Sequence, residues 1–430
     1  MSESMIGIGC IVLLFGLMLA SVPVFVAMGI SAFIGFLLIN SPMQSLTNMS
    51  NIIWQASSIF ELVAIPLFIF TGILMGRIGA GRDLFNVTTA WVGNVPNALG
   101  VATITACGIF ASICGSSIAN AATVGLVAIP LLLEANYTKA QAGGFVAGGG
   151  TLGIIIPPSI PFILYGVITE TSIGKLFMAG VIPGIIMMLL FVVYVTTSRP
   201  RIRQKLKMPM REKIAVSRRA IGVLLLPVII IGAIYTGIFT PTEVAALAVA
   251  YVVVLGIVQR RLNFGVFLGA AKDATKTTAM LLMLIIFGQY FAHFLTFEQL
   301  PQAMATWITG LSGNHFIIVT VMILVFILLG SFLESAAMLL ISVPIFFPIA
   351  QSIGMDPIVF GVFCCIAMEI AQIHPPIGIN LFTIHGISRI PLWDLSKGAI
   401  PFVLIQFVML YIVWLFPQIS LWIPNHMMLH

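Results

Sequence analysis

The chain has 430 residues, of which 60% are hydrophobic and only 7% carry a charged side chain. Soluble domains carry about 25% charged residues, so this composition excludes a soluble globular protein. The formal net charge is +6, and the basic residues are concentrated near the middle of the chain. Long uncharged stretches recur in both halves, and we predict an all-α polytopic protein of the lipid bilayer with roughly ten spans. Examples are Ile6–Ala20, Ile221–Tyr235 and Val403–Phe416.

The first half of the chain, residues 1–198, contains a segment that is too long for one span. Val95–Asn136 holds two apolar stretches around the small and polar run Cys114–Asn120. Its two ends are assigned to the same side of the membrane. A re-entrant helical hairpin over about 95–136 fits this pattern, because protein shields its polar tip at membrane depth. The alternative is two complete spans joined by a turn of small residues.

A broken helix follows at about 140–168. Pro157 and Pro158 stand in its middle, where a proline removes a backbone hydrogen bond and clashes with the preceding turn. Two consecutive prolines therefore leave several carbonyl groups free beside small and polar side chains. Carbonyl and hydroxyl oxygens suit a hard cation without strict geometry, and the N-terminus of a half-helix can face an anion. The alternative is a structural kink that binds nothing.

Residues 199–219 form a basic linker that divides the chain into two halves. Nine of the nineteen Lys and Arg residues lie here, opposed only by Glu212. A nucleic-acid-binding patch is one reading, but no aromatic residues interleave with the basic ones and apolar spans flank both sides. We therefore expect no nucleic-acid partner and a cytoplasmic linker, because cytoplasmic loops of membrane proteins carry an excess of Lys and Arg.

The second half, residues 220–417, repeats the first half at an offset of 218 residues. Five prolines of the first half fall on prolines of the second, far more than chance gives at one offset. Two serines and two glycines follow the same spacing. These pairs are Pro23/Pro241, Pro130/Pro348, Pro157/Pro375, Pro158/Pro376, Pro183/Pro401, Ser117/Ser335 and Gly180/Gly398.

The repeat predicts a second copy of the hairpin and of the broken helix. The second hairpin extends over about 314–353, with Gly330–Ser335 at its tip. The second broken helix extends over about 357–388 and contains the second Pro-Pro pair. Residues 418–430 form a C-terminal tail.

The basic residues that flank the two broken helices indicate opposite orientations. Lys139 precedes the first Pro-Pro pair, whereas Arg389 follows the second. If both basic residues are cytoplasmic, the chain crosses the membrane in opposite directions at the two breaks. This is an inverted structural repeat with two re-entrant hairpins and two broken transmembrane helices, and alternating-access transporters use this arrangement.

Two acidic residues lie within the apolar body, where an ionisable side chain indicates a functional site. Glu334 is at the second tip, and Glu369 lies before the second Pro-Pro pair. Each is a candidate structural or cation-supporting charge. Neither tip contains Lys or Arg. A negatively charged substrate must then be balanced by a cation, helix dipoles and polar groups, which favours cation-coupled transport.

Four motifs carry a resemblance to a known family. The chain resembles, over nearly its whole length, the large membrane subunit of tripartite ATP-independent periplasmic (TRAP) transporters. The resemblance implies uptake of an acidic organic solute of the C4-dicarboxylate or sialic acid type, driven by Na⁺ as the coupling ion. It also implies an elevator-type movement against a fixed scaffold, as in the related divalent-anion/sodium symporters. The motifs are SICGSSIANAAT, GGGTLGIIIPPSIPFILYG, LGSFLESAAMLLISVPIFFPI and IHPPIGINLF.

The same resemblance implies partners and a location. A periplasmic substrate-binding protein would deliver the solute, and a small membrane subunit of four helices would be a separate chain, because no additional four-helix block is present here. The expected location is the bacterial inner membrane.

Carried over residue by residue, the family pattern implies two sodium sites and a substrate site. The first sodium site would join the first tip to the first break: Ser116, Ser117, Asn120, Gly153 and Pro157. The second would join the second tip to the second break: Gly330, Ser335, Ile373 and Pro375. Substrate contacts between the tips would be Thr151, Ser159, His374 and Asn380.

Three other functions compete with this interpretation. A stand-alone divalent-anion/sodium symporter would keep the fold and need no binding protein. An intramembrane hydrolase would use Gly115–Ser117 as a nucleophile turn, but this requires a base within hydrogen-bond reach, and the first half contains no histidine. A channel is disfavoured, because continuous conduction does not require two inverted, broken halves.

Overall fold

A computed structural model describes residues 3–93, 95–198, 202, 208–311, 313–331, 333–375 and 378–427. Every regular element in these residues is helical, and nine helical segments among them have the length and apolar composition to cross a membrane. Many large apolar side chains on the outer helices are exposed, which suits contact with lipid. The prediction of an all-α polytopic protein is confirmed.

The first half contains ten α-helices and one 3₁₀-helix within its described residues. They are α1 (Glu3–Leu19), α2 (Val24–Ile39), α3 (Pro42–Ser57), η1 (Phe60–Val63), α4 (Ala64–Arg77), α5 (Ala80–Val92), α6 (Ala98–Cys114), α7 (Ser117–Glu134), α8 (Lys139–Ile155), α9 (Ile160–Thr169) and α10 (Ile173–Thr197).

The second half follows the same order with one difference. Its helices are α11 (Met210–Tyr235), α12 (Pro241–Val258), α13 (Phe264–Phe297), α14 (Leu300–Leu311), α15 (His315–Gly330), α16 (Ser335–Ser352), α17 (Pro357–Ile373), α18 (Ile379–Ser388), α19 (Leu392–Leu415) and α20 (Gln418–Asn425). Shifting α13 back by 218 residues covers 46–79, which is the stretch that forms α3, η1 and α4 in the first half. One long helix thus replaces three shorter ones.

Several parts of the predicted organisation fall on residues that are not described. These are 199–201 and 203–207 of the basic linker, Pro376 of the second Pro-Pro pair, and 428–430 of the tail. The remainder of the linker is partly helical, because α11 begins at Met210. The basic residues from Arg211 to Arg219 therefore stand on the first turns of α11.

Each long segment that the sequence singled out forms two helices. Helices α6 and α7 make the first hairpin and α15 and α16 the second, while α8–α9 and α17–α18 are the two interrupted helices. In the first half, α8 ends just before Pro157, and the next helix begins after Ser159. A proline at these positions cannot donate the backbone hydrogen bond that would continue α8.

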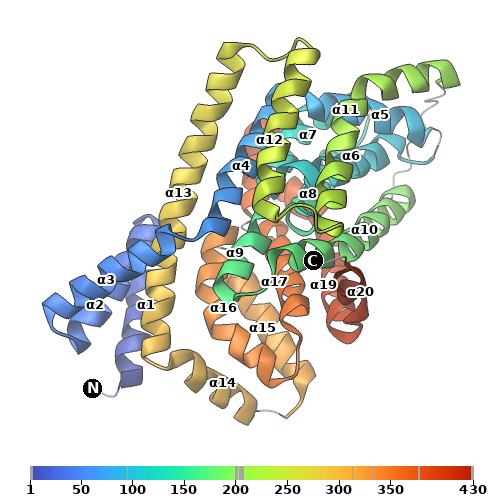
Figure 1. The fold of residues 1–430 in the computed structure, drawn as a ribbon. Helices are drawn as coiled ribbons and strands as arrows, with labels where there is room; N and C mark the ends of the chain where they lie inside the picture. Colours follow the sequence, from blue (N-terminus) through green and yellow to red (C-terminus); the bar gives the residue numbers. More distant parts are fainter. Residues whose placement is uncertain are drawn as a thin grey trace.

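Several helices of one half pack on helices of the other half, and in these cases the repeat-equivalent pair of helices makes the same contact. Helix α7 packs on α18 while α16 packs on α9, and α8 packs on α19 while α17 packs on α10. The outer helices follow the same rule, because α2 packs on α13 and α12 packs on α4. Figure 1 shows the hairpin α6–α7 in the upper part of the molecule and α15–α16 in the lower part, with α5 near the top and α14 at the bottom. The two hairpins therefore lie in opposite parts of the molecule in this view.

Glycines allow the central helices to approach closely. A Cβ atom on Gly398 of α19 would lie 1.9 Å from the carbonyl oxygen of Ala140 in α8, and one on Gly144 of α8 would lie 2.3 Å from the carbonyl oxygen of Gly398. Backbone meets backbone at this crossing, so larger side chains are excluded there. Helix α8 is consequently enclosed at the centre, with its residues from Ala142 to Ile155 all buried.

Candidate functional site

The first hairpin tip is a tight turn that packs directly on the first helix break. Helix α6 ends at Gly115 with φ +62°, and Ser116 caps α7 by accepting a hydrogen bond from the Ala119 N–H. A Cβ atom on Gly115 would lie 2.7 Å from the Pro158 carbonyl oxygen, and the Ile160 N–H donates to the Gly115 carbonyl oxygen at 3.3 Å. Glycine is needed at position 115 for both reasons.

Gly153 and Asn120 hold the hairpin against α8. A Cβ atom on Gly153 would lie 2.8 Å from the Ser116 carbonyl oxygen. The Asn120 Nδ2 atom lies 3.1–3.3 Å from the carbonyl oxygens of Cys107, Gly149 and Gly150. Its Oδ1 atom is buried and has no hydrogen-bond partner among the described residues. The structure thus brings Ser116, Asn120 and Gly153 together at the tip and the break, as the first predicted sodium site requires.

The second tip also packs closely on its broken helix, α17, but here the glycine is on the hairpin and the alanine on the broken helix. Gly330, at the end of α15, faces Ala371 of α17, and a Cβ atom on Gly330 would lie 2.3 Å from the Ala371 Cβ. In the first half the glycine is on the broken helix, since residue 153 is the equivalent of residue 371 (153 + 218 = 371). A Cβ atom on Gly378, beyond the second break, would lie 2.4 Å from the Gln372 carbonyl oxygen.

Gln372 joins the two tips through its side-chain amide. The Ser117 hydroxyl donates to the Gln372 Oε1 atom, and the Gln372 Nε2 atom donates to the Ser335 hydroxyl. The two serines are repeat-equivalent (117 + 218 = 335), so one residue connects the same position of both halves. Gln372 is 3% exposed. Sequence reasoning missed it, although an amide between Glu369 and His374 in a buried apolar helix was a usable signal.

A cavity of about 330 Å³ lies between the two tips and the flanking helices α4, α9 and α13. Most of its lining is apolar, and Glu334 is the only charged side chain among the described lining residues. Its polar side chains come from the tips, except for Thr277 of α13. The lining includes Gly115, Ser116 and Ser117 of the first tip, Glu334 and Ser335 of the second, Ile73 of α4, Leu164 of α9, and Thr277 and Met280 of α13.

A second cavity, which we call the vestibule, adjoins the tip cavity. It measures about 750 Å³ and shares four lining residues with the tip cavity, which are Gly72, Ile73, Ala119 and Ala122. The vestibule extends toward the junction of α4 and α5, where Arg77, Arg82 and Arg261 line it. Lys and Arg are typical of cytoplasmic loops, and the vestibule leads from the tips to the end where these arginines lie.

Two ion pairs fix the helices around the vestibule. Arg77 of α4 pairs with Asp273 of α13. Arg261 pairs with Asp83 of α5 and also donates to the Ile78 carbonyl oxygen at the end of α4. Asp273 lies on α13, and Arg261 lies in the loop just before it. Both ion pairs therefore join the first half to the second half at this end.

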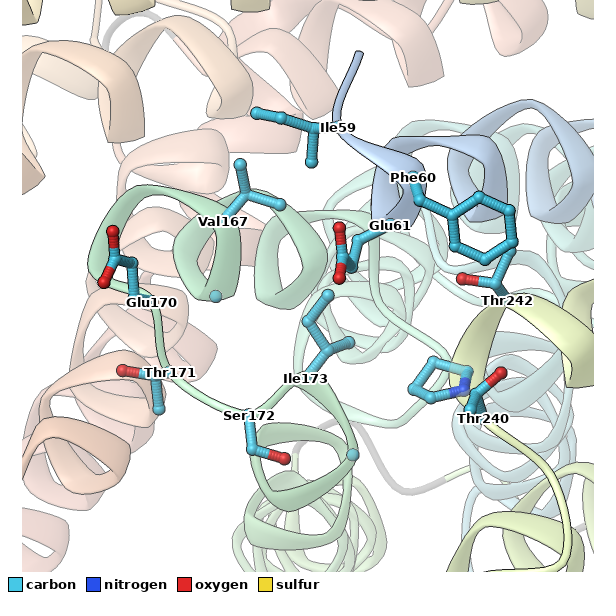
Figure 2. Close-up of a pocket in the computed structure, with 13 residues that line it drawn as sticks. Ile59, Phe60, Glu61, Val167, Glu170, Thr171, Ser172, Ile173, Thr240 and Thr242 are labelled. Carbon is cyan, nitrogen blue, oxygen red and sulfur yellow. The ribbon is translucent and has the colours of Figure 1, made fainter. Parts of the chain in front are cut away.

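A third cavity, of about 610 Å³, lies at the C-terminal end of the broken helix α8–α9 (Figure 2). It is formed where the α9–α10 turn faces η1 and the start of α12. Figure 2 shows the carboxylates of Glu61 and Glu170 and the hydroxyl groups of Ser172 and Thr240 around it. Glu170 follows α9 and Lys139 begins α8, so this cavity lies at the end of the interrupted helix that is remote from Lys139.

The predicted substrate contacts fall into two groups. Ser159 at the first break and His374 and Asn380 at the second each carry a buried polar atom without a hydrogen-bond partner among the described residues. Such atoms are uncommon in folded proteins, and they are expected where a ligand supplies the missing partner. Thr151 is in a different place, where it accepts a hydrogen bond from Gln406 of α19 at 2.8 Å.

The two acidic candidates lie in different surroundings. Glu334 precedes α16 and lines the tip cavity. Glu369 is fully buried between helices, and Gln406 reaches its carboxyl oxygen Oε2 at 3.4 Å. Gln406 is a second residue that sequence reasoning missed, because nothing in its apolar helix α19 indicates which neighbour it faces.

Comparison with known proteins was made against families, characterised proteins and solved structures. The family model described as the DctM component of the tripartite ATP-independent periplasmic transporter matches residues 11–419. The C4-dicarboxylate TRAP transporter large permease protein DctM of Pseudomonas aeruginosa is 39% identical over 93% of this chain and 94% of its own length. The sialic acid TRAP transporter large permease protein SiaM of Vibrio cholerae is 34% identical over 88% of this chain and 91% of its own length.

A solved structure has a related fold. The YdaH transporter of Alcanivorax borkumensis superposes with a TM-score of 0.59 over 89% of each chain, at 13% sequence identity. This likeness concerns the fold alone. The family match and the two permeases confirm the resemblance that the tip and Pro-Pro motifs carry. The chain therefore belongs to the DctM component family of TRAP transporters and is a multi-pass membrane transport protein, not an enzyme.

Proposed function

We propose that this chain is the transport subunit of a sodium-driven, binding-protein-dependent secondary transporter that imports an acidic organic solute. One observation carries the proposal: repeat-equivalent serines of two hairpin tips meet at Gln372 beside a cavity that both tips line. A site between two duplicated halves, with residues from both, is the arrangement that alternating access uses.

The chemistry of the tips supports sodium as the coupling ion. The groups there are hydroxyl, amide and backbone carbonyl oxygens, which suit a hard cation. Within the described residues, no group of three or more His, Cys, Asp and Glu side chains could hold a transition metal. The tip cavity has no Lys or Arg among its described lining residues. A bound cation would therefore supply the positive charge that an acidic solute needs.

The packing supports an elevator mechanism with inverted halves. Equivalent hairpins lie in opposite parts of the molecule in Figure 1, and repeat-equivalent pairs of helices make the same contacts between the halves. The vestibule adjoins the tip cavity on the side of the arginines, so we assign this conformation as inward-facing. In the outward-facing state the two hairpins and two broken helices would move as one body along α4, α12 and α13. The tip cavity would then open toward the third cavity.

The partners and the solute class follow from the relatives. TRAP transporters are tripartite by name, and the two permeases that this chain resembles are each named as the large permease protein of such a transporter. We infer a separate small membrane subunit, a periplasmic binding protein and a place in the bacterial inner membrane with the basic linker cytoplasmic. The named substrates of the two relatives, a C4-dicarboxylate and sialic acid, support an organic acid without selecting one.

Uptake into proteoliposomes tests the proposed function. The chain is reconstituted with its small subunit, and uptake of C4-dicarboxylates and sialic acid is measured with and without an inward Na⁺ gradient and a binding protein. We expect uptake only when both are present. Uptake without a binding protein would support a stand-alone symporter, and uptake that is indifferent to Na⁺ would contradict the proposal.

Replacing Ser117 or Ser335 with alanine should raise the Na⁺ concentration for half-maximal uptake about tenfold. Each substitution removes one hydroxyl oxygen from a tip and leaves one Gln372 amide atom without a partner, a loss of roughly 1–2 kcal/mol. Na⁺ titration of uptake measures the effect. Ser352→Ala, on an exposed residue at the far end of α16, is the control. An unchanged Na⁺ requirement in both tip variants would exclude these serines as ligands.

A further inference from the structure

Three buried polar residues form a cluster where α8, α17 and α19 pack together. Gln406 of α19 donates to the Thr151 hydroxyl of α8 at 2.8 Å and to the Glu369 carboxyl of α17 at 3.4 Å. All three side chains are 0% exposed. Thr151 and Glu369 are repeat-equivalent (151 + 218 = 369). Gln406 thus joins equivalent positions of the two halves, as Gln372 does at the tips.

The hydrogen bonds of this cluster lack one donor. The Thr151 hydroxyl donates to the Gly148 carbonyl oxygen at 2.8 Å, so its oxygen is the acceptor for Gln406. The two N–H groups of the Gln406 amide serve Thr151 and Glu369. The Glu369 Oε1 and Gln406 Oε1 atoms then remain as buried acceptors with no partner among the described residues. A proton on the Glu369 carboxyl would convert one of these acceptors into a donor.

The charges around Glu369 do not favour an ionised carboxylate. On the helices packed against α17, the basic side chains Lys139, Lys175 and Lys397 stand in the first two turns of α8, α10 and α19, whereas Glu369 lies in the last two turns of α17. No ion pair to Glu369 is present among the described residues. A buried carboxylate without a cation is strongly unfavourable.

The other titratable groups on these helices are uncharged or anionic, or lie at helix ends. The Cys365 side chain, one turn before Glu369 on α17, is a buried free thiol and supplies no cation. Tyr165 of α9 points to the start of α17, where its hydroxyl donates to the Pro357 carbonyl oxygen. The remaining groups stand at or near helix termini or outside the cluster: Asp356, Cys364 and His374 of α17 and its caps, Tyr194 of α10, His315 of α15, Glu334 before α16, Glu170 after α9, His385 and Arg389 of α18 and its cap, Asp394 and Tyr411 of α19, and His426 after α20.

We propose that Glu369 is a proton-binding site, and that its carboxyl is a neutral acid whose O–H completes the Thr151–Gln406–Glu369 cluster. The proton holds α8, α17 and α19 together at the centre of the body that carries both tips. Loss of the proton places an unpaired charge among three packed helices and loosens them. Transport and stability are then both sensitive to alkaline pH, and this sensitivity is separate from the sodium sites.

The direction of the pH effect follows from linkage. A carboxyl that keeps its proton in the folded chain but releases it in the unfolded chain contributes stability at low pH. This contribution is lost as the pH rises through the range in which the folded carboxyl ionises. The wild-type protein should therefore melt at lower temperatures as the pH rises from about 6 to about 9.

The test compares wild type with Glu369→Gln, whose amide N–H replaces the acid O–H. Melting temperature and Na⁺-driven uptake are both measured across this pH range, with Glu134→Gln, an exposed carboxyl at the end of α7, as the control. We expect the wild type and the control to lose about 2 °C or more and to lose uptake toward alkaline pH. In Glu369→Gln both declines should be smaller than in the wild type and the control.

Two results would overturn the proposal. One is an alkaline decline of melting temperature that is the same in Glu369→Gln and wild type. The other is a raised Na⁺ requirement in Glu369→Gln with an unchanged pH profile, which would assign a cation to the carboxylate. If Glu369→Gln does not fold, infrared spectroscopy of the wild type decides, because a protonated carboxyl has a carbonyl stretch that an ionised one lacks. The melting measurement does not require transport, so it remains decisive even if sodium-driven uptake is not found.

Discussion

Uptake by a Gln372→Leu variant should fall at least tenfold while the protein stays folded. Leucine has a similar size but can neither accept the Ser117 hydrogen bond nor donate to Ser335. One buried and one half-buried hydroxyl group would lose their partner, at a cost of about 1–3 kcal/mol for the buried one. These hydroxyls belong to opposite tips. The variant therefore has no hydrogen-bonded connection through residue 372 to hold the two tips at a fixed distance. Uptake at saturating Na⁺, together with the melting temperature, separates loss of function from loss of fold.

The matched control for this experiment is Gln351→Leu, at an exposed position near the end of α16. It makes the same chemical change in the same half of the chain, away from the tips. We expect the control to transport like wild type. Normal uptake by Gln372→Leu would show that the contact between the tips has no role in transport.

A Gly330→Ala substitution should reduce uptake about tenfold or more, and a second substitution, Ala371→Gly, should restore most of it. The added methyl group would lie 2.3 Å from the Ala371 Cβ, so the second tip would be displaced from α17. Overpacking of this kind costs about 1–3 kcal/mol. Removing the Ala371 methyl group makes room again, and it gives the second half the glycine that Gly153 supplies in the first.

This pair of substitutions contains its own control. Ala371→Gly alone should have a smaller effect than Gly330→Ala alone, because it leaves a small gap and creates no clash. The uptake rates of wild type, both single variants and the double variant form a double-mutant cycle, which compares the loss in the double variant with the sum of the two single losses. Additive losses in the double variant would contradict close packing of the second tip on α17.

The helical elements around the site could be predicted well from local chemistry. Proline cannot donate a backbone hydrogen bond, and this marks the end of α8 before Pro157. Gly115, followed by the N-capping residue Ser116, marks the first tip. These signals depend on a few consecutive residues, so no knowledge of the tertiary fold is needed to interpret them.

The contacts across the two halves could not be predicted in the same way. Ser117 and Gln372 are 255 residues apart, and so are Thr151 and Gln406. Which residues meet depends on how α8, α17 and α19 cross, and glycine contacts such as the one at Gly398 set these crossings. Thr151 illustrates the difficulty. The family resemblance implied a substrate contact for Thr151, and only the fold shows that its hydroxyl accepts a hydrogen bond from Gln406 of α19 and lies in the Glu369 cluster.

The inverted arrangement of the two halves is the claim on which the transport mechanism depends. It assigns Lys139 and Arg389 to the cytoplasmic side, and it assigns Glu170 and Asp356 to the periplasmic side. All four residues are exposed at helix ends. The five native cysteines are buried, so labelling of introduced cysteines has a low background.

The most direct test is therefore to replace each of these four residues with cysteine, one at a time, and to label intact cells with a membrane-impermeant thiol reagent. We expect the reagent to label positions 170 and 356 from outside and to reach positions 139 and 389 only after the membrane is opened. If positions 139 and 389 were labelled from opposite sides, the two halves would have the same orientation, and the alternating-access mechanism would be wrong.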